Sequence, residues 1–252
     1  MEKTIKNKST IDNPYLSIVA PAYNEELIID EVIHEWEKFI SEEKINAEIV
    51  ICNDGSRDKT ATILKTLQRK YRNLIICEND SNRGYGYALY NAIKHSNGKL
   101  IMTLDSDGQF DANGFSVLKE KLIAGKFDLV TGYRYRKRDS PIRVLADRGF
   151  NLLMRIIFGI KFKDTNCAQK LYHAEILKDL VIEARGYPAP TEIIIKALEK
   201  GAKIGETGVI HYSRKKGVTK IKLLQTSIDV FKFIIYLRFK LHAFRRKIIN
   251  TF

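Results

Sequence analysis

The sequence contains little cysteine, proline or glycine. Its 252 residues include 3 Cys, 5 Pro and 15 Gly. Together with the absence of any low-complexity tract, these numbers exclude a collagen-like chain, a mucin-like stalk and a wholly disordered protein. Cys52, Cys77 and Cys167 are odd in number and lack Cys-X-X-Cys spacing. We therefore expect reduced thiols, as in a cytosolic protein, and no structural zinc site.

The sequence also shows neither a membrane-spanning segment nor a secretory signal. The most apolar stretch, 231–241, is interrupted by Lys232, Arg238 and Lys240, whereas a spanning helix needs roughly 20 apolar residues in a row. Residues 1–13 are polar and charged and contain no apolar stretch of the kind found in signal peptides. We therefore expect a cytoplasmic chain that does not cross a membrane by itself.

Acidic residues are scarce in two segments. The whole chain has 43 Lys and Arg against 30 Asp and Glu, a net charge of +13. Residues 134–163 carry a net charge of +7 and residues 207–252 carry +10, so the remainder is mildly acidic. Such an arrangement favours an anionic partner on one face, which could be phospholipid, lipid phosphate or nucleic acid. A solvated basic surface is the alternative.

Short apolar runs alternate with helical patterns through the first half of the chain, which indicates an α/β fold with a mostly parallel central sheet flanked by helices. The predicted strands are 16–20, 48–52, 74–77, 100–104, 127–131, 169–172 and 203–212. The predicted helices are 26–43, 58–71, 84–95, 113–124, 141–158, 174–184, 191–200 and a terminal helix within 220–252.

The terminal segment combines apolar and basic residues at mostly helical spacing. Its apolar positions are Leu224, Ile228, Phe231, Ile234, Ile235, Leu241 and Phe244, with Lys and Arg between them. This composition suits an amphipathic helix lying in a membrane interface. Docking on the core of the protein or on a partner chain is the alternative.

Polar loops follow the first four predicted strands, and ligands of open parallel sheets bind beyond such strand ends. The loop after 100–104 contains Asp105 and Asp107, two residues apart. Two carboxylates at a strand end can share a divalent cation, and Mg²⁺ or Mn²⁺ commonly completes its coordination with phosphate oxygens. Helix capping is the ordinary alternative for such residues.

Eight stretches together resemble the family 2 glycosyltransferases of the GT-A fold, among them the dolichyl-phosphate mannose synthases and bacterial polyprenyl-phosphate glycosyltransferases. They are PAYNE (21–25), NDGSRD (53–58), NRGYGYAL (82–89), DSDGQ (105–109), GYRYRKR (132–138), KDTNCAQKLY (163–172), TEIIIKALEKGAKIGE (191–206) and HYSRKKGVTK (211–220). The resemblance covers about 14–222. It implies a catalytic domain at 14–219, preceded by a tail at 1–13 and followed by the basic helix at 220–252.

The resemblance implies a donor site and a metal site. The residues implied in nucleotide-sugar binding are Pro21, Tyr23, Asn24, Glu25, Asp54, Asp105 and Ser106. Asp105, Asp107 and Gln109 match the family's metal and diphosphate site, with Mg²⁺ or Mn²⁺ as cofactor. The chain departs from the common Asp-Asp-Gly-Ser motif at Asn53, which removes one negative charge and leaves the choice of nucleotide open.

The acceptor is implied by Arg134 and Arg148, which match arginines that bind the acceptor phosphate in the dolichyl-phosphate subgroup. A lipid phosphate is already largely an anion at neutral pH, so it needs positive charge rather than a base, and the guanidinium suits that task. Asp164 and Glu192 match acidic positions at the reaction centre, and Glu192 would be the base for a hydroxyl acceptor. Turn formation by Asp164 and helix capping by Glu192 are the alternatives.

A flexible loop is implied by the last matching stretch, where His211, Arg214 and Lys220 would close over the diphosphate, with a solvated turn as the alternative. The sequence thus predicts an inverting, metal-dependent glycosyltransferase. It would transfer a sugar from GDP-mannose or a UDP-hexose to a polyprenyl or dolichyl phosphate on the cytosolic membrane face. The expected partners are the anionic membrane surface and a membrane protein as further anchor, but not nucleic acid. A hydroxyl acceptor and a non-catalytic membrane-binding role are the alternatives.

Overall fold

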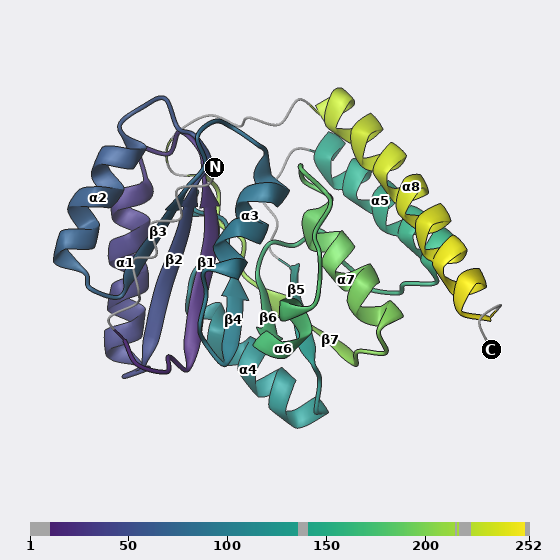
Figure 1. Ribbon diagram of the computed structural model, residues 1–252, viewed down its shortest axis with the longest axis horizontal. Coiled ribbons are helices and arrows are strands. Elements are labelled where there is room, and N and C mark those ends of the chain that lie inside the picture. The colour runs from purple at the N-terminus through teal and green to yellow at the C-terminus, as the bar shows by residue number, and fades with distance from the viewer. Residues whose placement is uncertain (1–10, 136–140, 215, 217–222, 250–252) are drawn as a thin grey trace.

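A seven-stranded sheet forms the centre of the protein, and helices cover both of its faces (Figure 1). The computed structural model describes residues 11–135, 141–214, 216 and 223–249. The strands are β1 (Leu16–Ala22), β2 (Ala47–Asn53), β3 (Leu74–Glu78), β4 (Leu100–Thr103), β5 (Leu129–Arg134), β6 (Lys170–His173) and β7 (Ile204–Val209). The helices are α1 (Ile29–Glu42), α2 (Thr60–Lys70), α3 (Tyr85–Lys94), α4 (Gly114–Gly125), α5 (Pro141–Phe158), α6 (Ala174–Lys178), α7 (Ala189–Glu199) and α8 (Leu223–Ile249).

The strand order is β3-β2-β1-β4-β6-β5-β7. The pairs β3–β2, β2–β1, β1–β4 and β5–β7 are parallel, whereas β6 is antiparallel to both β4 and β5. Because β6 reverses direction between them, β4 and β5 run the same way and end at one edge of the sheet. The loop that precedes β6 reaches the same edge. The mostly parallel sheet predicted from the sequence is confirmed.

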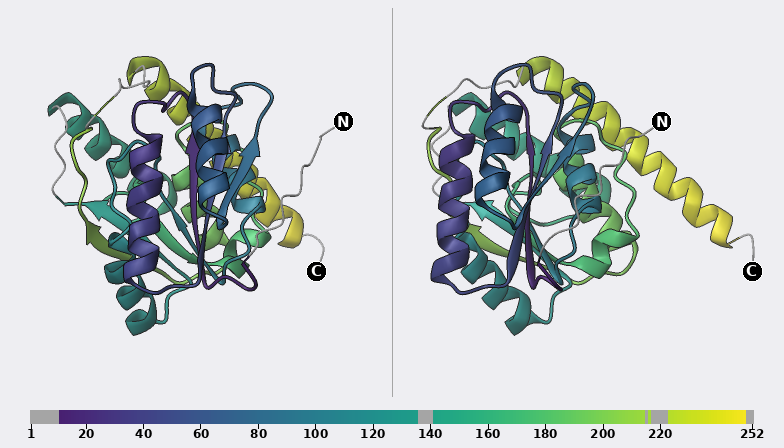
Figure 2. Two further views of the ribbon diagram at one scale, coloured as in Figure 1. Left: turned by 90° about the vertical axis from the view of Figure 1, so that its left-hand side faces the viewer. Right: turned by 60° about the vertical axis from the view of Figure 1, so that its left-hand side comes forward.

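Two hydrophobic layers enclose the sheet. Every residue of β1 and β2 is buried, as expected for strands covered on both faces. Helix α1 contributes Ile29, Val32, Ile33 and Trp36 at helical spacing to the layer that also contains α2 and α4. Helices α3, α6 and α7 contribute to the opposite layer. Figure 2 shows these helices on either side of the sheet.

Helices α5 and α8 lie side by side beyond α7 (Figures 1 and 2). A third cluster joins the three helices through Met154 of α5, Ile194 of α7, and Ile234 and Leu237 of α8, all fully buried. The predicted terminal helix therefore docks on the core through Ile234, one of the residues expected to face a membrane. The structure reveals no helix in the described part of the chain with the length and apolar character needed to span a bilayer.

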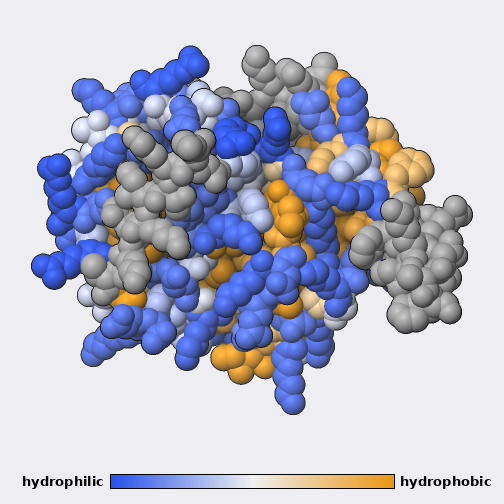
Figure 3. Space-filling view, in the orientation of Figure 1, coloured by the Kyte–Doolittle hydropathy of each residue, from blue (hydrophilic) through white to orange (hydrophobic). Residues whose placement is uncertain are grey.

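The opposite side of the α5–α8 pair is exposed and partly apolar. The exposed side chains are Leu152, Ile156, Ile228, Phe231, Tyr236 and Phe239. Figure 3 shows hydrophobic surface, in orange, over these two helices, with hydrophilic side chains between the apolar ones. The exposed cationic residues of α8 include Lys232, Arg238 and Lys240. The described part of α8 is thus amphipathic, with one side packed on the protein and another left open.

The predicted elements agree with the observed ones to within a few residues, with one clear error. The predicted helix 174–184 ends with α6 at Lys178. Beyond it, Leu180, Ile182 and Ala184 are buried at alternate positions, which is the pattern of an extended segment rather than of a helix. Side chains of α7, Glu192 and Lys196, contact the backbone of this extended segment at 181–184.

Candidate active site

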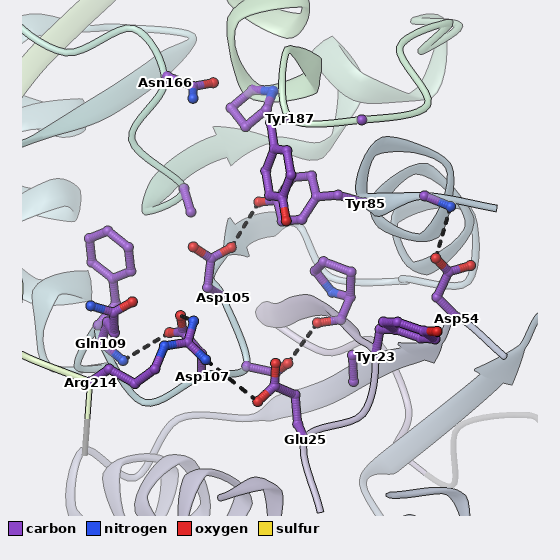
Figure 4. A pocket seen from close by; sticks show the side chains of 18 of the residues that line it. Tyr23, Glu25, Asp54, Tyr85, Asp105, Asp107, Gln109, Asn166, Tyr187 and Arg214 are labelled. Atoms are coloured by element: carbon purple, nitrogen blue, oxygen red, sulfur yellow. Dashed lines mark hydrogen bonds and ion pairs between the residues drawn. The ribbon is translucent and has the colours of Figure 1, made fainter. Parts of the chain in front are cut away.

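A cavity of about 440 Å³ opens at the edge where β1, β2, β4 and β5 end. Its size and position are typical of small-molecule sites in α/β proteins. The sequence-predicted residues that line it are Pro21, Tyr23, Glu25, Asp54, Asp105, Ser106, Asp107, Gln109, Arg134, His211 and Arg214. Figure 4 shows most of these side chains converging from separate loops. The fold therefore brings most of the predicted site together.

Asp54 lies at one end of this pocket and connects two of its loops by hydrogen bonds. Its Oδ1 accepts hydrogen bonds from Asn79 Nδ2 (2.7 Å) and from the backbone N–H of Arg83 (2.9 Å). Its Oδ2 accepts one from the N–H of Gly84 (2.9 Å). The buried carboxylate thus ties the loop after β2 to the loop that leads into α3. Tyr23 lines the pocket at the same end (Figure 4).

Asn24 is predicted to bind the nucleotide sugar, but it does not line the cavity among the described residues. Its backbone is left-handed, with φ of 51°, a conformation that asparagine tolerates better than most residues. Its Oδ1 accepts a hydrogen bond from the N–H of Arg57 (2.8 Å), and its own N–H donates to Ser56 Oγ (2.9 Å). In this structure, Asn24 joins the loops after β1 and β2.

Asp105 and Asp107 form the acidic centre of the pocket. Tyr85 donates its hydroxyl hydrogen to Asp105 Oδ1 (2.9 Å). Burial, together with the neighbouring charge of Asp107, raises the pKa of Asp105 to about 7. Asp107 Oδ1 accepts from the N–H of Gln109 (3.0 Å), while Oδ2 lies 2.5 Å from Arg214 Nη2. The pocket thus concentrates negative charge that a cation would stabilise.

The acidic centre fits a divalent cation whose coordination is completed by a ligand. The described residues contain no cluster of three or more His, Cys, Asp or Glu side chains able to enclose a metal ion. Asp105 and Asp107 supply carboxylate oxygens, the donors that Mg²⁺ and Mn²⁺ prefer. Burial and the charge of Asp107 raise the pKa of Asp105, and a bound cation would stabilise the charged form of this carboxylate against both. Gln109 lines the same pocket, and its Nε2 donates to the carbonyl oxygen of Tyr212 (3.1 Å).

Arg134 enters the pocket at the end of β5 and forms a two-pronged ion pair with Asp164. Arg134 Nε lies 2.6 Å from Asp164 Oδ2, and Nη2 lies 3.0 Å from Oδ1. Asp164 does not line the cavity itself, so it acts on the pocket by orienting Arg134. Arg148, the second predicted phosphate ligand, is exposed on α5 and is not among the described lining residues.

Glu192, predicted at the reaction centre, is not among the described residues that line the pocket. It is fully buried in α7. Its carboxylate accepts hydrogen bonds from the N–H groups of Glu183 and Ala184 and pairs with Lys196. A carboxylate engaged in this way is poorly placed to take a proton from an acceptor hydroxyl, because base catalysis requires hydrogen-bond reach to the reacting group.

The last predicted loop contacts the loop after β4. Phe110 and His211 form an isolated antiparallel bridge, and the N–H of Tyr212 donates to the carbonyl oxygen of Gln109 (2.9 Å). Arg214 then reaches Asp107 and lies 3.9 Å from Glu25. His211 and Arg214 therefore border the acidic centre, and Lys220 lies outside the described residues.

Sequence reasoning missed an aromatic wall of the pocket. Tyr85 and Tyr187 stack with ring centroids 5.5 Å apart and an interplanar angle of 24°. Asn166 lines the cavity nearby, and its buried Oδ1 has no hydrogen-bond partner among the described residues. Tyr85 and Asn166 fall inside two of the matching stretches, which was the available signal. Tyr187 stands between a glycine and a proline, a pattern that marks a turn but no ligand.

Comparisons with known proteins agree with this architecture. The model of the family described as "Glycosyl transferase family 2" matches residues 17–181. A dolichyl-phosphate beta-glucosyltransferase from Dictyostelium discoideum is 28% identical over 255 residues, covering 94% of this chain and 77% of the relative. A dodecaprenyl-phosphate galacturonate synthase from Rhizobium johnstonii is 28% identical over 233 residues, covering 89% and 68%.

The same architecture occurs in a solved structure. Glucosyl-3-phosphoglycerate synthase from Mycobacterium tuberculosis, in complex with Mn²⁺ and UDP-glucose, superposes with a TM-score of 0.70 at 18% identity. The match covers 89% of this chain and 79% of that one. At this identity the likeness shows a shared fold.

Proposed function

Because this chain belongs to glycosyl transferase family 2 and has the expected GT-A fold, we propose that it transfers a hexose from a nucleoside diphosphate sugar to a polyprenyl phosphate. The observation that carries the proposal is the meeting of Asp105 and Asp107 with Arg134 in one cavity. The acidic pair suits a metal-bound diphosphate, and the arginine suits an incoming phosphate. Two relatives are named for transfer to dolichyl or dodecaprenyl phosphate, which supports this acceptor class.

The donor would lie along the loops after β1, β2 and β4. In this proposal Tyr23 and Asp54 border the nucleoside, and Asp105 and Asp107 hold the cation that binds the diphosphate. That cation, Mg²⁺ or Mn²⁺, would stabilise the charge that develops on the leaving diphosphate. Arg214 pairs with Asp107 in the structure. When the donor binds, the guanidinium of Arg214 would release this carboxylate and contact a diphosphate oxygen instead.

The acceptor would approach Arg134. Its guanidinium is held by Asp164 through two contacts, and a fixed guanidinium matches a phosphate better than a mobile charge does. A phosphate nucleophile is already anionic near neutral pH, so the reaction needs orientation and charge stabilisation rather than a base. The position of Glu192 agrees with this, because the residue suggested as base for a hydroxyl acceptor is engaged elsewhere.

Membrane contact would occur through the α5–α8 surface. Its exposed apolar side chains and neighbouring cations have the composition of a helix at a bilayer interface. We place the protein at the cytosolic membrane face, where its acceptor's phosphate would be presented, and a membrane-protein partner would be an additional anchor. The alternative of a non-catalytic membrane-binding protein loses its basis, because the chain belongs to a family of transferases.

A donor panel tests this function. The purified protein is incubated with Mn²⁺ or Mg²⁺, a short polyprenyl phosphate and labelled UDP-glucose, UDP-galacturonate or GDP-mannose. Label that moves into the organic phase from one donor is the expected result. Transfer to added oligosaccharides instead of the lipid would contradict the proposed acceptor.

The blank for this panel is Asp107→Asn, which should reduce transfer by at least about 100-fold because the cation loses the negative charge of one ligand. Asp80→Asn is the matched control, because Asp80 is exposed and absent from the described pocket lining. Full activity of Asp107→Asn would contradict the metal site.

A further inference from the structure

The segment between α6 and α7 brings Tyr187 to the pocket, and α7 holds this segment from behind. Glu192 Oε1 and Oε2 lie 3.0 and 3.1 Å from the backbone nitrogen of Glu183, and Oε2 accepts from the N–H of Ala184 (2.8 Å). Glu192 has no exposed surface. A buried carboxylate with these contacts fixes the path of the backbone at 183–184, because leaving these N–H groups unpaired would be costly.

Lys196 completes the attachment one helical turn further along α7. Its Nζ lies 2.5 Å from Glu192 Oε1 and 2.6 Å from Glu183 Oε1, and it donates to the carbonyl oxygen of Val181 (2.7 Å). The lysine therefore neutralises the buried carboxylate and adds a third attachment point to the same segment. We call Glu192 and Lys196 together the α7 clamp.

On its other side the clamped segment meets the start of α3. The N–H of Gly86 donates to the carbonyl oxygen of Arg185 (2.8 Å). A Cβ atom at Gly86 would lie 2.0 Å from the carbonyl oxygen of Ala184, so the two backbones are in direct contact. Tyr187, two residues after Arg185, stacks on Tyr85. The relative position of the two rings thus depends on where the clamp holds the backbone.

Tyr85 directly follows Gly84, whose N–H donates to Asp54 Oδ2, and the Tyr85 hydroxyl donates to Asp105 Oδ1, so the aromatic wall runs from the Asp54 end of the pocket to the acidic centre. Figure 4 shows the stacked rings between Asp105 and Asp54, with Asn166 beyond Tyr187 on the Asp105 side. A nucleoside diphosphate sugar with its nucleoside near Asp54 and its diphosphate at Asp105 would extend along this wall and place its sugar at the far end, toward Tyr187 and Asn166. The unpartnered, buried Oδ1 of Asn166 is an acceptor that a sugar hydroxyl would satisfy.

We propose that Glu192 and Lys196 are positioning residues that hold Tyr187 against Tyr85 and so shape the part of the pocket that receives the donor's sugar. The inference rests on the proposed function, because it presumes a nucleotide sugar in this cavity. It assigns the clamp to recognition of the sugar rather than of the nucleotide. Loss of the clamp should therefore weaken binding of the nucleotide sugar and leave binding of the free nucleoside diphosphate nearly unchanged.

Calorimetric titration with UDP-glucose and with UDP, both with Mn²⁺, separates these effects, and GDP-mannose with GDP is the second pair. Glu192→Gln should weaken UDP-glucose binding by about tenfold or more and change UDP binding by less than about twofold. Tyr187→Ala should reproduce this pattern. The double variant should bind UDP-glucose no more weakly than Tyr187→Ala alone, since both changes remove one contact. Glu175→Gln, an exposed position on α6, is the matched control.

Three results would overturn the inference. They are equal weakening of UDP and UDP-glucose in Glu192→Gln, unchanged binding of both ligands, and a double variant whose loss is the product of the two single losses. Should Glu192→Gln fail to fold, Lys196→Met carries the same comparison, because it removes the ion pair and leaves the carboxylate contacts to the backbone. A wild-type protein that binds neither nucleotide sugar would instead overturn the proposed function.

Discussion

Arg134 Nε lies 2.6 Å from Asp164 Oδ2, and the second prong of this ion pair joins Nη2 to Oδ1 at 3.0 Å. The pair connects the end of β5 with the loop before β6, which are 30 residues apart in the chain. It presents one arginine to the pocket in a fixed direction. Substitution of the Asp164 carboxylate should therefore affect binding of the acceptor phosphate that Arg134 is proposed to contact.

Asp164→Asn should raise the KM for polyprenyl phosphate by about tenfold, corresponding to about 1.4 kcal/mol, and leave the donor KM within about twofold. The amide keeps the size of the side chain but loses the charge that orients Arg134. Steady-state kinetics with each substrate varied in turn measures the contrast. Equal increases in both KM values would contradict the assignment of Arg134 to the acceptor. Arg134→Lys, which keeps the charge but not the planar fork, should give a similar loss.

Chelation should abolish transfer. EDTA removes the cation that Asp105 and Asp107 are proposed to hold, and added Mn²⁺ or Mg²⁺ should restore activity. Arg214 pairs with Asp107 in the described structure, so Arg214→Met should strengthen binding of Mn²⁺ alone by removing a competing cation. Titration of Mn²⁺ without nucleotide measures this effect. Weaker Mn²⁺ binding in the variant would show that Arg214 does not compete for this carboxylate.

The strands of the first half of the sheet could be predicted from sequence because their signal is local. Fully buried strands such as β1 and β2 appear as short apolar runs regardless of their neighbours. The place of β6 between β4 and β5 depends on pairing between distant segments, for which the sequence offers no periodicity. The acidic centre was predictable for a similar reason, because Asp105 and Asp107 follow directly on a strand.

Glu192 was placed at the reaction centre through the resemblance to the family, and the helix predicted for 174–184 gave no sign of the backbone contacts that its carboxylate makes. Read as a helix, that segment would satisfy its own N–H groups and leave the Glu192 carboxylate available for chemistry. In the structure the helix stops at Lys178, and the N–H of Ala184 turns to Glu192 instead. A tertiary contact thus replaces the helical hydrogen bonding expected from local propensity, and it engages the carboxylate of Glu192, eight residues after Ala184.

Gly86→Ala should destabilise the protein by about 1 to 3 kcal/mol and weaken nucleotide-sugar binding. The new methyl group would lie 2.0 Å from the carbonyl oxygen of Ala184 and 2.9 Å from Ala189 Cβ. Gly149→Ala in α5 is the matched control, because nothing lies within 4 Å of a Cβ built there. It should be neutral or stabilising by about 0.5 to 1 kcal/mol, as expected for alanine in a helix. Equal denaturation midpoints for the Gly86→Ala and Gly149→Ala variants would contradict the close backbone contact between Gly86 and Ala184.

Stability should fall in acid through Glu183. Although burial opposes it, hydrogen bonds from Lys196, Lys240 and Tyr236 lower the pKa of Glu183 from 4.5 to about 2. Its folded pKa lies below its unfolded pKa, so the charged form stabilises the fold above about pH 4.5 and this contribution is lost as the pH falls toward 2. Between pH 5 and pH 3, the melting temperature of Glu183→Gln should therefore fall by less than that of the wild-type protein. An identical loss in both proteins would contradict this role.

Alanine substitutions on the two sides of α8 should have different effects, one on stability and the other on membrane binding. Leu237→Ala should destabilise the protein by about 2 to 5 kcal/mol, because Leu237 is fully buried in the cluster with α5 and α7. Phe239 is 72% exposed, so Phe239→Ala should leave the melting temperature unchanged and reduce co-sedimentation with vesicles containing anionic lipid. Unchanged co-sedimentation of Phe239→Ala, and of Phe231→Ala beside it, would contradict membrane contact through this surface.

Helix α4 separates two groups of site residues along the chain. In the proposed reaction, the nucleoside and metal contacts at Tyr23, Asp54 and Asp105 precede α4, whereas the acceptor contact Arg134 and its partner Asp164 follow it. The two groups meet at one edge because β6 lets β4 and β5 run in the same direction. A recombinant protein joined within α4 would therefore inherit its nucleotide preference from one parent and its lipid preference from the other.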